Sequence, residues 1–207
     1  MLRCGKLSLE ALPRLPHPRD DPTAPKLWLV LDEVVDPQNL GALLRSAYFI
    51  GGDSIGVLVC AKNSAPPTPV VSAASAGALE LIDVQSTSNL PRTLNAAKDD
   101  GFRIIGASSS PVPNSDASVH DLHDLPQDDR PTLLVLGSEG HGLRTLVAKA
   151  CTDLVRIPGQ EHSADRYNDS SDDGEGDGDN GSSVGVDSLN VSVTGGILLW
   201  HLKNSVL

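Results

Sequence analysis

Hydrophobic residues in this chain gather in short runs, separated by segments with the spacing of helices. Five apolar runs predict strands, at 27–31, 54–60, 102–108, 132–137 and 154–158, with a shorter strand at 81–84. Because the longer runs are apolar at successive positions instead of alternating, we expect these strands to be buried on both faces.

The segments between the strands favour helices. Asp36 and Pro37 form a good helix start, as N-cap and first helical residue, and Gly51 and Gly52 form a good end. Further helices are predicted at 70–79, 90–100, 143–151 and 188–206, the last with Ser188 as its cap. The alternation predicts an α/β fold with a mostly parallel sheet covered by helices on both faces.

Two segments lie outside this pattern. Residues 1–26 are rich in proline and irregular, so we expect a flexible lead-in, and the prolines disfavour the amphipathic helix of a transit peptide. Residues 161–183 contain Gly, Ser, Asp and Asn with almost no apolar side chain. This composition predicts a disordered acidic insertion within a single domain over 27–207.

The net charge of −11 on 207 residues initially argues against a nucleic-acid partner. The insertion at 161–183 holds eight acidic residues and one basic residue, however, so the rest of the chain carries only −4. The overall charge therefore does not exclude RNA. No apolar stretch approaches the ~18 residues needed to span a membrane. Three widely spaced cysteines support neither a disulfide framework nor a zinc site, and favour a reducing compartment.

Three polar clusters are candidates for chemistry. In residues 36–47, Asn39 stands in the first turn of the predicted helix, and Arg45 is the one cation among leucines. Residues 134–143 run from a strand into three glycines around Glu139. This spacing is neither the dinucleotide fingerprint nor a P-loop, and the carboxylate would repel a phosphate.

The third cluster, residues 186–196, places Ser188, Asn190 and Ser192 at a helix start, followed by two glycines. In isolation each cluster also has a purely structural explanation: a surface arginine, a tight turn, and helix caps with close packing. The segment 120–124, with two histidines and two aspartates, has the residue types of a metal site. A solvated loop explains it better, and we expect no metal.

Taken in order, the clusters resemble the three signature motifs of the SpoU (TrmH-type) branch of the SPOUT RNA methyltransferases. The matching residues are Asn39, Gly41 and Arg45 for N-x-G-x-x-x-R; Gly137, Glu139 and Gly140 for G-x-E-G; and Ser188, Leu189, Asn190, Val191 and Ser192 for S-L-N-V-S. The segments 75–80 and 157–158 also recur in this family. Residues 32–49 particularly resemble the mitochondrial large-subunit rRNA ribose methyltransferases of fungi.

The resemblance implies a C-terminal trefoil knot, a homodimer, and S-adenosylmethionine as the cofactor. It further implies methylation of a ribose 2′-hydroxyl in RNA, with a guanosine of mitochondrial large-subunit rRNA as target, and hence a mitochondrial location or otherwise a cytoplasmic one. By position, it assigns cofactor contacts to Leu136, Gly137, Gly140, Ile157, Pro158, Ser188 and Leu189. It assigns the methyl-transfer site to Asn39, Arg45, Glu139, Asn190 and Ser192.

Three alternatives stay open: a tRNA ribose as target, a catalytically idle RNA-binding or assembly module of the same fold, and a nucleotide-binding α/β enzyme. Two features depart from the family. The acidic insertion lengthens the link between Pro158 and the last motif, and 26 irregular residues cannot form the N-terminal substrate-binding domain that rRNA-directed members carry. We therefore expect either a truncated chain or RNA recognition that depends on a partner.

Overall fold

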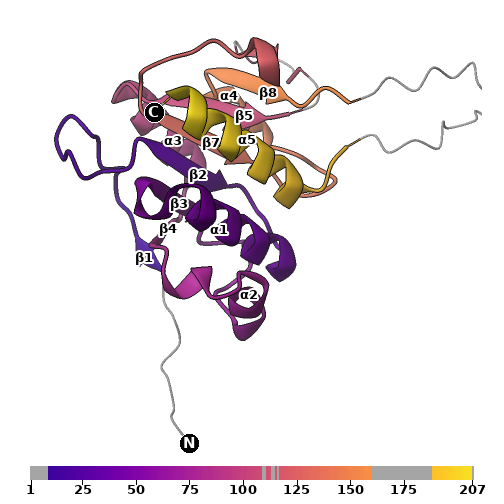
Figure 1. Cartoon of the computed structure of the whole chain (residues 1–207). Helices are drawn as coiled ribbons and strands as arrows, with labels where there is room; N and C mark the ends of the chain where they lie inside the picture. Colours follow the sequence, from indigo (N-terminus) through magenta and orange to yellow (C-terminus); the bar gives the residue numbers. More distant parts are fainter. Residues whose placement is uncertain (1–8, 109–110, 113–114, 116, 160–187, 207) are drawn as a thin grey trace, which may run out of the picture.

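A parallel β-sheet runs through the centre of the computed structural model, which describes residues 9–108, 111–112, 115, 117–159 and 188–206 (Figure 1). Within this part of the chain the sheet has eight strands in the order β1-β4-β3-β2-β7-β5-β8-β6. They are β1 (Glu10–Ala11), β2 (Leu27–Leu31), β3 (Ile55–Cys60), β4 (Val84–Thr87), β5 (Arg103–Ala107), β6 (Ser118–Asp121), β7 (Thr132–Leu136) and β8 (Asp153–Arg156).

Every pairing between these strands is parallel, which confirms the predicted sheet type. The two central strands, β2 and β7, are buried along their whole length. In register, Leu27 of β2 lies opposite Ile55 of β3 on one side and Thr132 of β7 on the other. Strands buried on both faces account for the continuous apolar runs in the sequence.

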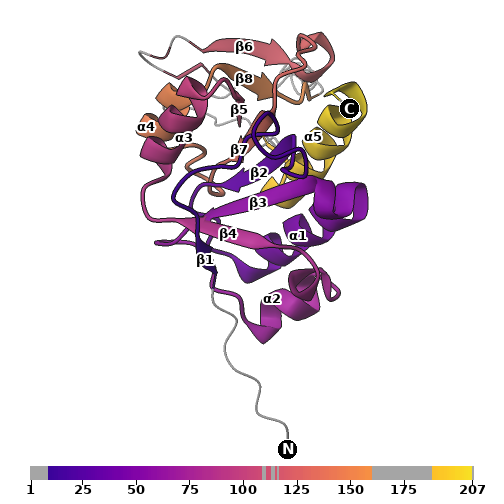
Figure 2. The same ribbon diagram turned by 90° about the vertical axis from the view of Figure 1, so that its left-hand side faces the viewer.

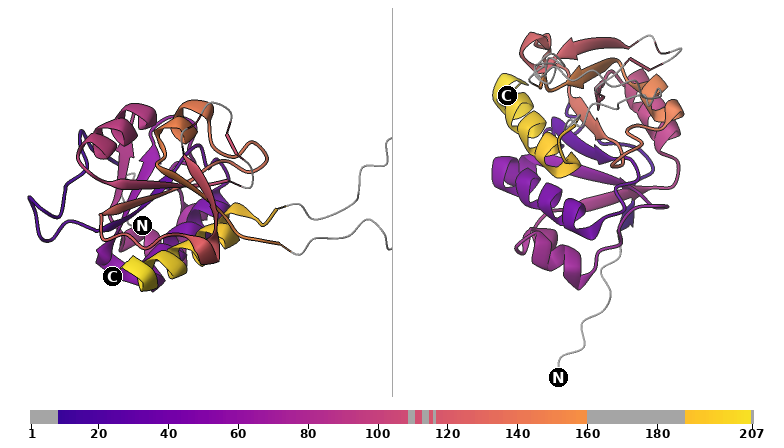
Figure 3. Two further views of the ribbon diagram at one scale, coloured as in Figure 1. Left: turned by 90° about the horizontal axis from the view of Figure 1, so that it is seen from above. Right: turned by 90° about the vertical axis from the view of Figure 1, so that its right-hand side faces the viewer.

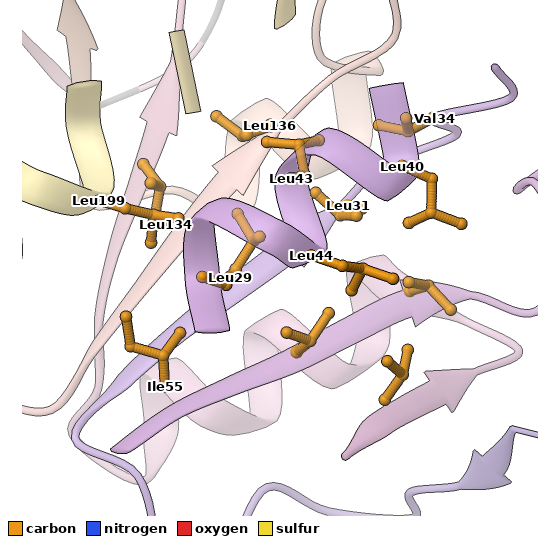
Figure 4. Close-up of a cluster of buried hydrophobic side chains, with 14 of the residues drawn as sticks. Leu29, Leu31, Val34, Leu40, Leu43, Leu44, Ile55, Leu134, Leu136 and Leu199 are labelled. Carbon is orange, nitrogen blue, oxygen red and sulfur yellow. The ribbon is translucent and has the colours of Figure 1, made fainter. Parts of the chain in front are cut away.

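Helices cover both faces of the sheet, as predicted (Figures 2 and 3). They are α1 (Pro37–Gly51), α2 (Pro69–Ala74), α3 (Leu90–Asp99), α4 (Thr145–Ala150) and α5 (Val191–Val206). Alternate residues of β2 divide between two cores, because successive side chains of a strand point to opposite faces. Leu29 packs with α1 and α5 in one core (Figure 4), and Val30 packs with α3 and α4 in the other.

Helix α1 begins and ends as its sequence predicts. The Asp36 side chain accepts a hydrogen bond from the backbone N–H of Gln38 at 3.1 Å, and Pro37 is the first helical residue. Gly41 faces α2 so closely that an added Cβ would lie 2.9 Å from the backbone nitrogen of Ser75. The glycine of the first motif therefore lets these two helices pack backbone against backbone.

Residues 9–26 differ from the prediction of a flexible segment. Strand β1 pairs with β4, the Leu15 side chain is 4% exposed in the core beside α3, and Arg14 forms an ion pair with Asp100. The strand pairing, the buried leucine and the ion pair together hold this segment against the domain, and none of them follows from a periodic sequence pattern. Residues 1–8 lie outside the described part of the chain, so the prediction for them stays untested.

Several other boundaries also differ. The helix predicted at 70–79 is the shorter α2 followed by a 3₁₀ turn at Ala78–Glu80, because Gly77 adopts a left-handed φ of 89° between them. The strand predicted at 81–84 lies instead at Val84–Thr87, and β6 extends into the segment 120–124, which was expected to be a solvated loop. No helix in the described residues is long and apolar enough to span a membrane. The predicted insertion at 161–183 falls outside the described residues.

Candidate functional site

A pocket of about 780 Å³ opens at the carboxyl ends of β5, β7 and β8. After β2 the chain crosses to β3 on one side, whereas after β7 it crosses to β8 on the other. Loops diverge at such a switch point, and parallel sheets bind their ligands there. The start of α5 closes the pocket with Ser188, Leu189 and Asn190.

A glycine turn after β7 forms one wall of this pocket. Ser138 and Gly142 exchange two backbone hydrogen bonds of 3.1 and 3.0 Å, and Gly140 and Gly142 have left-handed φ values of 80° and 65°. A Cβ on Gly137 would overlap the carbonyl group of Gly142 and lie 2.5 Å from the nitrogen of Leu143. The turn therefore presents bare backbone to the pocket, which needs glycine at these positions.

Asn190 joins the three motifs at the mouth of the pocket. Its Nδ2 donates hydrogen bonds to Oε1 of Glu139 at 2.7 Å and to Oδ1 of Asn39 at 3.1 Å. Its Oδ1 accepts from the backbone N–H of Ser192 at 2.7 Å and from the Ser192 hydroxyl at 2.6 Å. Both amide hydrogens and both acceptor positions are thus in use, and this network fixes the orientation of the amide.

The same contacts correct the predicted start of the last helix. Helix α5 begins at Val191, and the side chain of Asn190, not that of Ser188, accepts the hydrogen bond from the first turn. Ser188 is instead exposed and lines the pocket. The capping function of Asn190 anchors it at the helix start with its amide group aimed at Glu139.

Most of the predicted cofactor residues line the pocket. Those in the lining are Leu136, Gly137, Gly140, Ile157, Ser188 and Leu189, together with Glu139 and Asn190 from the predicted methyl-transfer site. Pro158 and Ser192 are outside the lining, and Asn39 is 6% exposed behind Asn190. Their predicted roles stay predictions, since no bound molecule is present.

Arg45 does not join this group within one chain. Its exposed side chain borders a second hollow of about 460 Å³ together with Tyr48, Phe49, Ala76 and Leu81. We find no hydrogen bond or ion pair between Arg45 and Glu139 in the described residues, where the carboxylate is bound by Asn190. Arg45 lies on the outer side of α1, whereas Asn39 is buried in the first turn.

The sequence prediction missed part of the pocket wall. Ala107 and Ser108 at the end of β5 line it, as do Val155 of β8 and Thr194 of α5. The strand predicted at 102–108 could have pointed to Ala107 and Ser108, because parallel strands have their carboxyl ends at the same edge of a sheet. Without the strand order, nothing distinguished this end from that of β3.

Several ionisable side chains around the pocket have neighbours or burial that shift their pKa. Arg156 lines the pocket and forms an ion pair with Asp121, and its hydrogen bond lowers the pKa of that carboxyl group. Burial raises the pKa of the Cys151 thiol to about 12, which makes it a poor nucleophile. Ligand atoms of Asp121, His123 and Asp124 lie within 4.8 Å of one another, so the expected absence of a metal stays a prediction.

Comparison with known proteins identifies the family. The sequence model of the SpoU rRNA Methylase family matches residues 26–166, more than half of the chain. The chain belongs to this family. The SpoU motifs Asn39–Arg45 and Gly137–Gly140 both fall within the matched range.

Two curated SpoU relatives carry the name rRNA methyltransferase 1, mitochondrial. The protein from Homo sapiens is 39% identical over 186 residues, and the one from Schizosaccharomyces pombe is 37% identical over 182. These alignments cover 88% and 87% of this chain but only 46% and 52% of the relatives. The chain therefore spans about half the length of these curated relatives.

Solved SpoU structures share the fold. A putative RNA methyltransferase of the TrmH family from Porphyromonas gingivalis is 30% identical, with a TM-score of 0.63 over 86% of this chain and 59% of that one. The SpoU methyltransferase AviRb from Streptomyces viridochromogenes, in complex with AdoMet, has a TM-score of 0.60 at 21% identity, again over 86% and 59%. The α/β architecture described above is thus that of the SpoU and TrmH methyltransferases.

Proposed function

We propose that this chain transfers a methyl group from S-adenosylmethionine to a ribose 2′-hydroxyl of RNA. The observation that carries the proposal is the position of Asn190, which ties Asn39 and Glu139 together at the mouth of the pocket. Three segments far apart in the sequence supply these side chains. A purely structural network would not need to end at an open cavity lined by backbone from a glycine turn.

The pocket suits S-adenosylmethionine in size and chemistry. Its volume of about 780 Å³ is in the range of small-molecule sites, and its apolar lining includes Leu136, Ile157 and Leu189. The glycines of the turn, Gly137, Gly140 and Gly142, line the pocket without side chains, so a ligand meets backbone there. The exposed carboxylate of Glu139 favours a cationic ligand over a phosphate, which agrees with a cofactor that carries a positive charge.

When bound, S-adenosylmethionine supplies a methyl group that is already activated on a positively charged sulfur. The residues of the chain then have to place the acceptor hydroxyl in line and help its proton to leave. Asn190, fixed by Glu139 and Asn39, orients the Ser192 hydroxyl and presents the Glu139 carboxylate to the pocket mouth. We assign proton acceptance to this carboxylate network.

We assign Arg45 to the RNA phosphate next to the target ribose. Its guanidinium stays protonated, so it serves as an anion ligand and not as a base. Because it lies on the outer side of α1 in its own chain, we propose that it reaches the pocket of a second copy in a homodimer. Exposed apolar side chains border the same hollow: Phe49 of α1 is 84% exposed, and Leu81 is 59% exposed.

The exposed face of α5 supports the same arrangement. Leu189, Val193, Ile197 and Trp200 recur every three or four residues, so they form one stripe, and each is at least 38% exposed. Helices α1 and α5 lie side by side (Figure 1), and α1 carries a further exposed apolar side chain, Phe49. An apolar strip of this kind is typical of an interface between identical subunits.

The finer points of the fold and substrate are part of the proposal. The contact of Asn190 with Glu139 of the glycine turn supports the C-terminal trefoil knot that the resemblance implies. The names of the human and fission-yeast relatives support rRNA as the substrate and mitochondria as the location. A guanosine in the large-subunit rRNA is the specific target that we propose.

The direct test combines cofactor binding with mapping of methylated riboses. Calorimetry of the wild-type chain with S-adenosylmethionine should show one site per subunit, and mitochondrial rRNA from cells without the protein should lack one ribose methyl group. Asn190→Ala should reduce transfer about a hundredfold or more. A missing tRNA methyl group would favour the tRNA alternative, and RNA binding without transfer would favour an idle module. Failure of the wild-type chain to bind S-adenosylmethionine would refute the proposed methyltransferase activity.

A complementation experiment tests the role given to Arg45. Arg45→Ala and Asn190→Ala should each abolish transfer, whereas a mixture refolded together should recover about a quarter of wild-type activity, because half the dimers then contain one intact site. Arg45→Ala should keep its affinity for S-adenosylmethionine. If the refolded mixture stayed inactive, Arg45 would not act in the site of the partner subunit.

A further inference from the structure

An ion pair between a buried aspartate and a partly exposed arginine anchors the far end of the glycine turn. Asp32 directly follows β2 and is 1% exposed, and Arg144 directly follows the turn. The backbone N–H of Arg144 donates to Oδ2 of Asp32 at 3.1 Å, and its Nε donates to Oδ1 at 2.7 Å. The carboxylate thus holds the backbone and the side chain of the same residue. We call this contact the Asp32–Arg144 clasp.

One further loop, the one after β3, converges on the clasp together with Glu33. Nη1 of Arg144 lies 3.0 Å from Oε1 of Glu33, and this oxygen also accepts a hydrogen bond from Asn63 at 3.2 Å. Glu33 and Asn63 both have left-handed φ values, 61° and 59°, which cost energy in residues other than glycine. Nη2 of Arg144 also donates to the sulfur of Cys60 at 3.3 Å. The arginine therefore joins the loops after β2, β3 and β7.

The clasp does not touch the pocket itself. Asp32 and Arg144 are both absent from its lining, whereas Leu143 and Thr145, the two neighbours of Arg144, are part of it. The other end of the turn is fixed by the close approach at Gly137. The wall between these points has its shape set from both ends, and an error of about 1 Å in such a wall costs up to a hundredfold in binding or rate.

We propose that Asp32 and Arg144 are positioning residues that set the shape of the glycine turn and thereby the affinity of the chain for S-adenosylmethionine. This inference rests on the proposed function of the pocket. A merely structural role would predict a different result: the affinity would then follow the stability of the fold, whichever ion pair is removed.

The sheet offers a matched control at its other end. Arg103, 2% exposed at the start of β5, donates from Nε to Oδ2 of Asp153 at 3.0 Å. This pair also joins an arginine to an aspartate, although here the arginine is the more buried partner, and it lies at the amino ends of the strands. Neither residue lines the pocket.

The test is a double-mutant comparison of the two pairs in the full chain. Arg144→Met should lower the thermal midpoint, because it leaves Asp32 buried without its cation, and should weaken S-adenosylmethionine binding about tenfold to a hundredfold. The double variant Asp32→Asn with Arg144→Met should recover most of the midpoint but not the affinity. Arg144→Lys should recover the affinity only in part, because it loses the fork geometry.

Control variants and a measurement without cofactor complete the design. Arg103→Met, and its double variant with Asp153→Asn, should change the midpoint but leave the affinity within roughly twofold. In the cofactor-free protein, amide hydrogen exchange at residues 138–144 should speed up in the Asp32/Arg144 double variant. It should stay unchanged in the Arg103/Asp153 double variant. Recovery of affinity together with stability in that variant, or an equal loss of affinity in Arg103→Met, would overturn the inference. Absence of binding by the wild type would instead refute the proposed function.

Discussion

The two ends of the central sheet use the same ion pair for different purposes. At the amino ends, Arg103 binds Asp153 and donates from Nη1 to the carbonyl of Pro126 at 2.6 Å, next to the tightly packed Phe102. At the carboxyl ends, Arg144 binds Asp32 beside an open pocket. The pair at the amino ends lies against a packed part of the core. The pair at the carboxyl ends supports loops that leave a cavity between them.

The backbone shows the same difference. Glu33 and Asn63, two of the described non-glycine residues with left-handed φ, lie on loops after the carboxyl ends of β2 and β3. At the amino ends, the segment before β2 buries Leu15, and the Trp28 indole donates to the carbonyl of Pro25 at 3.1 Å. Two of the three described positions with this strain therefore lie at the end that carries the proposed site, and the third, Ala76, follows α2.

The largest effect is expected from adding one methyl group at each end. In Gly137→Ala, the new Cβ meets the backbone of Gly142 and Leu143, which cannot move without opening the turn. We expect a loss of about 3 kcal/mol or more in the free energy of unfolding. Binding of S-adenosylmethionine should fall below detection in calorimetry.

Gly56→Ala is the matched change at the amino end. Its Cβ would lie 2.5 Å from the ring of Trp28, a buried side chain, so stability should fall by about 1–3 kcal/mol. Its cofactor affinity should remain within roughly twofold of wild type. If both variants lost affinity in proportion to stability, the two ends would not be functionally distinct.

An intermediate effect is expected from acid at the amino end. Burial alone would raise the pKa of Asp153, but hydrogen bonds from Arg103 and Thr152 hold it below its ordinary value. A carboxyl group with a lowered pKa stabilises the fold above about pH 4, the unfolded value, and this contribution is lost as the pH falls through the folded value. Urea unfolding at several pH values should show wild type more stable than Asp153→Asn near neutral pH.

That difference should shrink in acid, because protonated Asp153 and asparagine are then both neutral beside the Arg103 cation. A difference that stays constant down to about pH 2 would show that Asp153 contributes by shape and not by charge. Calorimetry near neutral pH should give both proteins the same affinity for S-adenosylmethionine, since the pair lies away from the pocket lining.

The sequence predicted the features that depend on local pattern. The range of β2, the cap at Asp36 and the parallel sheet follow from apolar runs and capping chemistry, which act over a few residues. Asn190 and Glu139 were identified from motifs, but their direct hydrogen bond depends on the order of the strands. The motifs supplied the residues, and the topology brought them together.

The missed features depend on distant partners. Asp32 and Arg144 are separated by 112 positions, and neither belongs to a recognised motif, so only the sheet order reveals their contact. Arg45 is a different case: its motif predicts a role at the site, but in a single chain it borders another hollow, so that prediction stays untested. Residues 9–26 were predicted to be flexible because a single buried Leu15 has no periodicity.

The smallest effect should come from removing two helix caps. The comparison tests whether the first turn of α1 helps to hold Asn190 in place. Asp36 caps α1 and Asn89 caps α3 with a hydrogen bond to the backbone N–H of Arg92 at 3.2 Å. Alanine at either position should cost about 1 kcal/mol of stability.

Only Asp36→Ala should slow methyl transfer, by a few fold, because Asn39 stands in the first turn of α1 and supports Asn190. Asn89 follows β4, which is two strands from β2, so the rate of methyl transfer should stay unchanged in Asn89→Ala. Asp36→Ser should restore the rate along with the cap. Equal rates in both alanine variants, measured with matched stability losses, would mean that Asn190 holds its position without help from the first turn of α1.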